Sequence, residues 1–306
     1  MALFGVPTVI VLAFVPALLW GFTPVIEKRA LAAGGVPYQA AVMVVGVDAA
    51  IYVLLLVLRG EVPFVDLSLG TLAVFVVAGF FGTAIGRIAI FAGNDLVGAS
   101  ISSAVVSSRP LFATILAIGF LGEAVTIETV AGVVVLVVGL AVLSLARGGD
   151  LSGWETRDLL VPVLAAVCFA IGNVLRRFGL LTGEVTALEA VAVNEVAALI
   201  ALVAFAVARG RRDLLTRPPR TYAIFGVSGV ITAVALLSMF TAFSLPGGQV
   251  ALVDPLMATA PLFTLVFSAV LLRDLERVSV GVVAGAVLVV IGVALVTAGP
   301  AAVAGA

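Results

Sequence analysis

The sequence predicts an all-α integral membrane protein, with ten transmembrane helices arranged as two inverted five-helix repeats. Apolar stretches about twenty residues long fill the 306-residue chain, and 63% of its residues are hydrophobic against 11% charged. The second half also repeats signals of the first. A bilayer core about 30 Å thick needs roughly twenty helical residues per crossing. Ten spans with short connectors therefore leave no room for a soluble catalytic domain.

Helices are the expected spanning elements because they satisfy their own backbone hydrogen bonds in hydrocarbon. Glycine and proline punctuate the expected breaks, as at Gly34-Gly35. The first helix is expected to be retained, since no basic segment precedes its apolar run. The expected helices cover 9–30, 38–58, 70–93, 97–121, 126–146, 159–181, 186–208, 221–243, 248–272 and 278–298. They form a first repeat (1–146), a polar connector (147–158) and a second repeat (159–306).

Four pairs of matching signals carry the internal repeat. Five spans per copy is an odd number, so the two copies must cross the membrane in opposite directions. Inverted repeats of this kind underlie many secondary transporters, whose sites lie near mid-bilayer where the halves meet. The pairs, at offsets of 149 to 153, are Trp20 with Phe169, Lys28 with Arg177, Pro110-Leu111-Phe112 with Pro261-Leu262-Phe263, and Glu123 with Glu276.

These signals resemble the EamA-like members of the drug/metabolite transporter superfamily. The resemblance covers both halves and implies a ten-helix carrier that moves a small organic solute across the cell membrane by alternating access. It implies amino acids, other polar metabolites or drugs as the solute class. The residues that carry it are Trp20-Gly21 with Lys28, Pro110 thirteen residues before Gly122-Glu123, and Gly132 with Gly139.

Three departures from the family pattern leave the substrate open. Phe169 replaces the tryptophan in the second copy, Pro261 lies fifteen residues before Glu276, and Arg87 occupies the third helix. The side of the termini is open as well. Basic residues gather on odd-numbered connectors, which the positive-inside rule places in the cytoplasm, with both termini outside. The resemblance implies the opposite orientation.

Four charged residues fall well inside expected spans, away from the helix ends, where a charge costs about 2.5–3.5 kcal/mol on insertion scales. Asp48 and Glu195 lie near the centres of the second and seventh helices, 147 residues apart, as repeat counterparts would. Arg109 is central on the fourth helix, and Asp254 lies within the ninth. Further charges expected toward helix ends are Glu27, Lys28, Arg87, Arg176 and Arg177.

Two interpretations of the carboxylates stay open. Asp48 and Glu195 can bind a proton or the solute in a central cavity, because desolvation makes a carboxylate easier to protonate. Alternatively, both are structural and locked in ion pairs with Arg87, Arg109 or another cation.

Arg109 and Asp254 form the second part of the candidate site, as groups that hold opposite ends of a zwitterion. Asp254-Pro255 also predicts a broken or kinked ninth helix. The full set of candidate substrate-binding or coupling residues is Asp48, Arg109, Glu195, Asp254, Trp20, Arg87, Asn173 and Gln249.

Other classes of function lack their residues in this sequence. The chain has no histidine and one cysteine, Cys168, so neither a serine protease triad nor an internal disulfide is expected. We therefore expect no catalytic residues, no metal and no cofactor. The net charge of −1 does not favour nucleic acid as a partner. A membrane channel or a structural membrane scaffold is the alternative to a carrier.

The expected partners are the small-molecule solute and the lipid bilayer. Two pairs of glycines, Gly82 with Gly86 and Gly281 with Gly285, have the small-xxx-small spacing of closely packed membrane helices. The same spacing allows a homodimer through these faces.

Overall fold

The computed structural model confirms a helical protein with ten apolar spans. It describes residues 2–3, 6–32, 34–62, 64, 67–146, 153–211, 216–271 and 279–304. The helices are α1 Thr8–Ala32, α2 Pro37–Leu58, α3 Leu69–Gly79, η1 Phe80–Ile85, α4 Gly86–Val97, α5 Ala99–Val106, α6 Arg109–Leu116, η2 Ala117–Leu121, α7 Ile127–Leu145, η3 Thr156–Leu159, α8 Leu160–Thr182, α9 Ala187–Ala208, α10 Pro219–Ser244, α11 Val250–Met257, α12 Ala260–Leu271 and α13 Val280–Ala304. Ahead of α1, β1 Ala2–Leu3 pairs antiparallel with β2 Val6–Pro7.

Three spans are not single α-helices. The third runs through α3, η1 and α4, where η1 is a π-helix of six residues. The fourth span breaks at Ser107–Ser108 into α5 and α6, and the ninth breaks at Ala258–Thr259 into α11 and α12. In both broken spans a proline is the second residue after the break. A proline lacks the backbone N–H and is tolerated in the first turn of a helix, so it begins the new segment.

The expected break of the ninth helix is present, but it does not lie at Pro255. That proline stays inside α11, and the helix continues to Met257. By contrast, α1 runs unbroken from Thr8 to Ala32 through Pro16 and Pro24. A proline in the sequence therefore indicates that a helix can break, but it does not identify the residue at which the break occurs.

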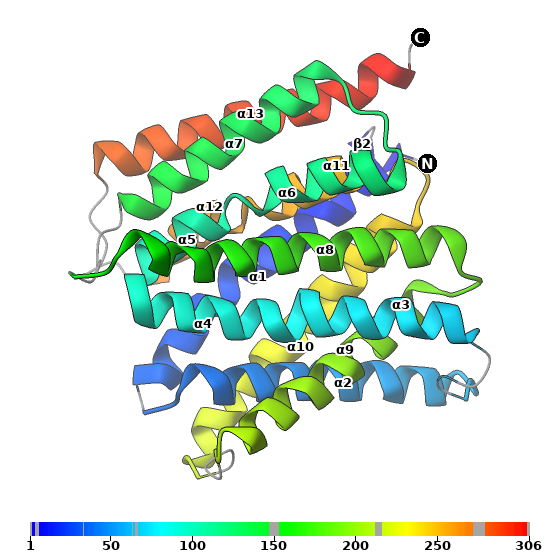
Figure 1. Ribbon diagram of the computed structural model, residues 1–306, viewed down its shortest axis with the longest axis vertical. Helices are drawn as coiled ribbons and strands as arrows, with labels where there is room; N and C mark the ends of the chain where they lie inside the picture. Colours follow the sequence, from blue (N-terminus) through cyan, green and yellow to red (C-terminus); the bar gives the residue numbers. More distant parts are fainter. Residues whose placement is uncertain are drawn as a thin grey trace.

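The packing of the helices follows the internal repeat (Figure 1). The fifth and tenth spans, α7 and α13, lie side by side at one edge of the molecule. The first span, α1, packs against α10 and α12, while its counterpart α8 packs against α4 and α6. The second and seventh spans, α2 and α9, also pack against each other. Equivalent helices thus meet equivalent neighbours, as expected for two duplicated halves.

Glycines set the closest approaches between helices, all within this chain. A Cβ on Gly82 would lie 2.6 Å from the Cα of Gly172, so the third span and α8 meet backbone to backbone. A Cβ on Gly86 would lie 2.7 Å from the ring of Phe169, also on α8. Gly285 on α13 packs against the backbone of α7 in the same way. The small residues noted in the sequence therefore hold helices of one chain together.

Some sequence features lie outside the described residues. They are Glu276 of the repeat motif, the first half of the polar connector (147–152), and four basic residues of odd-numbered connectors, Arg147, Arg212, Arg273 and Arg277. The start of α1, the end of α13 and the start of α11 lie at the same end of the molecule (Figure 1). This end is called the terminal end below.

Candidate functional site

An ion pair joins the two broken spans in the interior. The Nε atom of Arg109, the first residue of α6, lies 3.2 Å from Oδ2 of Asp254 on α11. Asp254 is fully buried, and the Arg109 side chain is 20% exposed. The other carboxylate oxygen, Oδ1, accepts a hydrogen bond from the Asn173 amide on α8. Three sequence-predicted residues from three different spans therefore meet in one cluster.

Arg176 continues the cluster one turn along α8. Its Nη1 atom donates to Oδ1 of Asn173 at 2.8 Å, and its Nε donates to Oδ1 of Asn194 on α9 at 3.1 Å. The third donor, Nη2, contacts the Thr83 hydroxyl of η1 at 2.8 Å. The guanidinium also lies 5.6 Å from the ring centre of Phe240, a favourable cation–π distance. Sequence reasoning placed Arg176 among the helix-end charges, whereas the structure buries it at a junction of four spans.

Glu195 ends this chain of contacts. Its Oε1 atom accepts hydrogen bonds from the Asn194 amide at 2.7 Å and from the Thr83 hydroxyl at 3.1 Å. The two residues thus connect Glu195 to Arg176 without a direct ion pair. We call the connected residues the central network: Arg109, Asp254, Asn173, Arg176, Thr83, Asn194 and Glu195.

Asp48 lies on α2 beside this network. It is fully buried and interacts electrostatically with Glu195 on the neighbouring α9 and with Arg87 on α4. Neither of its carboxyl oxygens forms a hydrogen bond of normal geometry with the described part of the chain, and neither does Oε2 of Glu195. Two buried carboxyl groups therefore approach each other with three oxygens unpaired. Leaving such groups charged and unpaired in low dielectric is costly.

The local backbone explains how Thr83 reaches the network. It lies within η1, and π-helical turns often occur at functional sites because they redirect side chains. Gly79 ahead of it contacts the backbone of α9: a Cβ there would lie 2.1 Å from the carbonyl oxygen of Asn194. Gly82 makes the equivalent close contact with α8. In the sequence, the spacing of Gly82 and Gly86, which flank Thr83, was the signal for close packing here. It did not identify the threonine.

Besides Asp48, three predicted site residues do not join the central network. Arg87 on α4 is half-buried and interacts electrostatically with Asp48, Glu195 and Glu27. Trp20 is half-buried on α1. Gln249 lies at the terminal end, where it precedes α11 and its side-chain amide donates to the Ala124 carbonyl at 3.3 Å.

A second charged group, Glu123 with Arg177, connects the halves at the terminal end. Glu123 follows η2, and its two carboxylate oxygens accept the backbone N–H groups of Val250 at 2.8 Å and Ala251 at 3.1 Å. These N–H groups begin α11 and have no partner within that helix, so the carboxylate caps it. Burial raises the pKa of the Glu123 carboxyl, outweighing the lowering by these hydrogen bonds and by the charge of Arg177.

Arg177 stabilises the other side of the same connector. Its Nη1 donates to the carbonyl of Phe243 and, at 3.2 Å, to that of Leu245 at the end of α10. A cation at a helix C-terminus and an anion at the next N-terminus both complement the helix dipoles. The sequence indicated Glu123 as a repeat motif, and Arg177 as a repeat motif and a helix-end charge; their pairing with backbone groups of a distant segment carried no local signal.

The described residues hold no group of three His, Cys, Asp or Glu side chains that could bind a metal ion. The arrangement instead offers a buried cation–anion pair, linked through amide and hydroxyl groups to carboxyl groups with unpaired oxygens. Such a site can exchange internal partners for a charged solute or a proton.

Comparisons with known proteins agree with this architecture. The model of the EamA-like transporter family matches residues 7–145 and 157–298. An uncharacterized transporter of Clostridium kluyveri is 31% identical over 128 residues, which is 42% of this chain and 40% of that relative. A solved crystal structure, described only as that of a protein, superposes with a TM-score of 0.73. It covers 94% of this chain and 96% of its own at 19% identity, so it supports the fold alone.

Proposed function

We propose that this chain, which belongs to the EamA-like transporter family, carries a small zwitterionic solute by alternating access, coupled to proton movement. Membership makes it a multi-pass membrane transporter and not an enzyme. An amino acid is the solute class that we favour; other polar metabolites and drugs form the wider class. The halves that rock against each other are 1–146 and 159–306.

One observation carries the proposal: the ion pair between Arg109 and Asp254 joins the two halves inside the membrane region. A solute with a carboxylate and an ammonium group can replace this internal pair with two external ones. Its carboxylate takes the place of Asp254 beside Arg109, in a charge-assisted contact. Its ammonium group takes the place of Arg109 beside Asp254, while Asn173 orients that carboxylate. Solute binding then separates two segments that the empty carrier holds together.

Asp48 and Glu195 are the proposed coupling groups. Their unpaired oxygens cost less when one carboxyl group carries a proton, because two neighbouring buried carboxylates repel each other. Arg176 contacts both Asn173 and the partners of Glu195, so a change at Asp254 can reach Glu195 through four hydrogen bonds. Deprotonation on one side of the membrane then favours the state that releases the solute.

The remaining candidates have peripheral roles in this proposal. Arg87 balances the charges of Asp48 and Glu195, Trp20 lines the path along α1, and Gln249 helps to close the terminal end. A homodimer through Gly82–Gly86 or Gly281–Gly285 receives no support, because helices of the same chain fill the contacts at these glycines.

The solute class is tested with purified protein in proteoliposomes. A thermal-shift screen against amino acids, nucleosides, sugar phosphates and cationic dyes selects a ligand, because binding to the native state raises the unfolding temperature. Uptake of the labelled ligand should then saturate and be stimulated by unlabelled ligand inside the vesicles. Flux that rises linearly with concentration, without counterflow, would indicate the alternative function, a channel.

The coupling proposal is tested with Asp48→Asn and Glu195→Gln. Each variant should lose uptake driven by a pH gradient while it retains exchange of internal for external solute. Asp95→Asn, at an exposed position near the end of α4, is the matched control and should behave as wild type. If both interior variants keep wild-type gradient-driven uptake, neither carboxyl group carries the coupled proton.

A further inference from the structure

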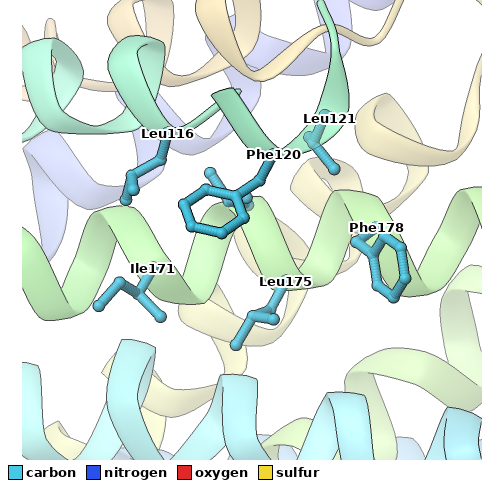
Figure 2. A pocket seen from close by; sticks show the side chains of 7 residues that line it. Leu116, Phe120, Leu121, Ile171, Leu175 and Phe178 are labelled. Atoms are coloured by element: carbon cyan, nitrogen blue, oxygen red, sulfur yellow. The ribbon is translucent and has the colours of Figure 1, made fainter. Parts of the chain in front are cut away.

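An apolar cleft opens between the fourth and sixth spans, away from the polar groups described above. It has a volume of about 410 Å³. Figure 2 shows its walls, which come from the α6–η2 segment on one side and from α8 on the other. The lining residues are Leu116, Phe120, Leu121, Ile171, Val174, Leu175 and Phe178.

The cleft faces the hydrocarbon of the bilayer. All of its lining residues belong to two membrane spans, 101–121 and 156–182. Phe120 at its rim is 77% exposed and Phe178 is 41% exposed, and the nearby Ile115 and Leu181 are exposed as well. Exposed apolar side chains of this density, on two membrane spans, mark a face that meets lipid. The medium that reaches the cleft is therefore hydrocarbon and not water.

The cleft cannot close by a simple approach of its walls. Behind it, α8 is fixed to the third span by the backbone contact between Gly172 and Gly82. The α6 side is fixed through Arg109 to Asp254, and the end of η2 is fixed through Glu123 to the start of α11. Because these contacts hold both walls, the space persists unless something fills it.

An acyl chain is the occupant that this space fits. The volume lies within the range of about 300–1,000 Å³ found for ligand sites. Water gains nothing there, since an apolar cavity offers it no hydrogen-bond partners. An unfilled space would forfeit dispersion contacts along both walls. A flexible hydrocarbon chain from the surrounding bilayer restores these contacts.

We infer that the cleft between α6–η2 and α8 is a binding site for one acyl chain of a membrane phospholipid. The chain lies against the face of α8 formed by Ile171, Val174, Leu175 and Phe178. The same helix carries Asn173, Arg176 and Arg177 toward the interior, and η2 leads directly into Glu123. The bound chain thus keeps α8 and η2 at a fixed separation. This separation holds Asn173, Arg176 and Arg177 on α8, and Glu123 after η2, in position for their contacts in the interior. This inference is independent of the proposed solute and coupling.

The test uses the full chain in nanodiscs that contain phosphatidylcholine with a photoreactive diazirine in its acyl chain. After illumination, peptide mass spectrometry locates the labelled residues. We expect labelling of residues 116–121 and 171–178 to saturate as the fraction of diazirine lipid rises, and to exceed several-fold the labelling at Phe80. Phe80 is a suitable reference because it is similarly exposed, at 44%, outside the cleft.

A filled cleft provides the matched comparison. Val174→Phe adds bulk to a wall residue that is 6% exposed, and it should remove the excess labelling while labelling at Phe80 stays unchanged. Val234→Phe, at an exposed position on α10, is the control for added bulk. Should Val174→Phe fail to fold, the saturation curve of the wild-type protein decides alone. Labelling of the cleft that rises linearly and equals that at Phe80 would overturn the inference.

Discussion

The fourth and ninth spans share a backbone but differ in chemistry. Both break at equivalent positions, Ser107–Ser108 and Ala258–Thr259, which are 151 residues apart. In both, the helix resumes one residue ahead of the matching proline. Their charges do not match: the counterpart of Arg109 is Ala260, and the counterpart of Asp254 is Ser103.

This difference indicates which feature the duplication preserved. The break is a property of the backbone and serves both halves, whereas each broken span supplies only one sign of charge. Because the copies are inverted, the cation of one broken span meets the anion of the other across the interface. Complementary divergence of two similar spans therefore built a site that neither half contains alone.

The largest expected effect comes from removing one member of this pair. Asp254→Asn leaves Arg109 without its counter-charge, and Arg109→Gln leaves a fully buried carboxylate without a paired cation. Breaking a buried pair costs about 3–5 kcal/mol, so both variants should lower the unfolding temperature in detergent strongly. The double variant should recover part of the loss. If the loss in the double variant equals the sum of the losses in the two single variants, the two spans are not coupled through this pair.

Packing of the first and sixth spans should give the next effect. Gly21 on the first span and Gly172 on the sixth both touch another backbone: a Cβ on Gly21 would lie 2.8 Å from the carbonyl of Ala260 at the ninth-span break. Gly21→Ala and Gly172→Ala should each cost about 2–3 kcal/mol, since the obstacle is backbone that cannot turn away. Gly119→Ala is the control, because its Cβ would meet nothing within 4 Å. If Gly119→Ala lowers the unfolding temperature as much as the other two variants do, the close contact is refuted.

A smaller effect should distinguish the third span from its counterpart. The eighth span, α10, is a continuous α-helix, whereas the third contains η1 and presents Thr83. Thr83→Val leaves Arg176 and Glu195 each short of one partner, which should cost about 1–2 kcal/mol. Thr264→Val, whose hydroxyl bonds its own helix at Ala260, should cost less. The unfolding temperatures of Thr83→Val and Thr264→Val, measured under the same conditions, test this order.

The smallest effect concerns pH at the terminal end. The pKa of Glu123 in the folded protein lies above its ordinary value of 4.5, because of burial. A raised folded-state pKa stabilises the protein at low pH, and this contribution is lost as the pH rises through the folded-state pKa. The unfolding temperature of wild type relative to Glu123→Gln should therefore fall as the pH rises from near 4.5. A difference that is constant with pH would mean that Glu123 does not titrate in this range.

The sequence by itself determined the ten spans, the two inverted halves and the residue types buried in the membrane. The length of the apolar stretches and the repeat of Pro110 at Pro261 are local signals, which can be identified without knowledge of any contact. Asp48, Arg109, Glu195 and Asp254 stood out because charges are rare in apolar spans. These features depend only on which residues occur and how far apart they lie.

Only the tertiary structure decided which charges meet. Nothing in the spacing of Arg109, Asp254 and Asn173 shows that they converge, because the contacts join residues 81 to 145 positions apart. The structure likewise turned Arg176 from a helix-end charge into the centre of the network, and gave Thr83 and Glu123 partners on other helices. Helix rotation, the π-helix and glycine-mediated approach fix these contacts, and all three depend on how neighbouring helices pack.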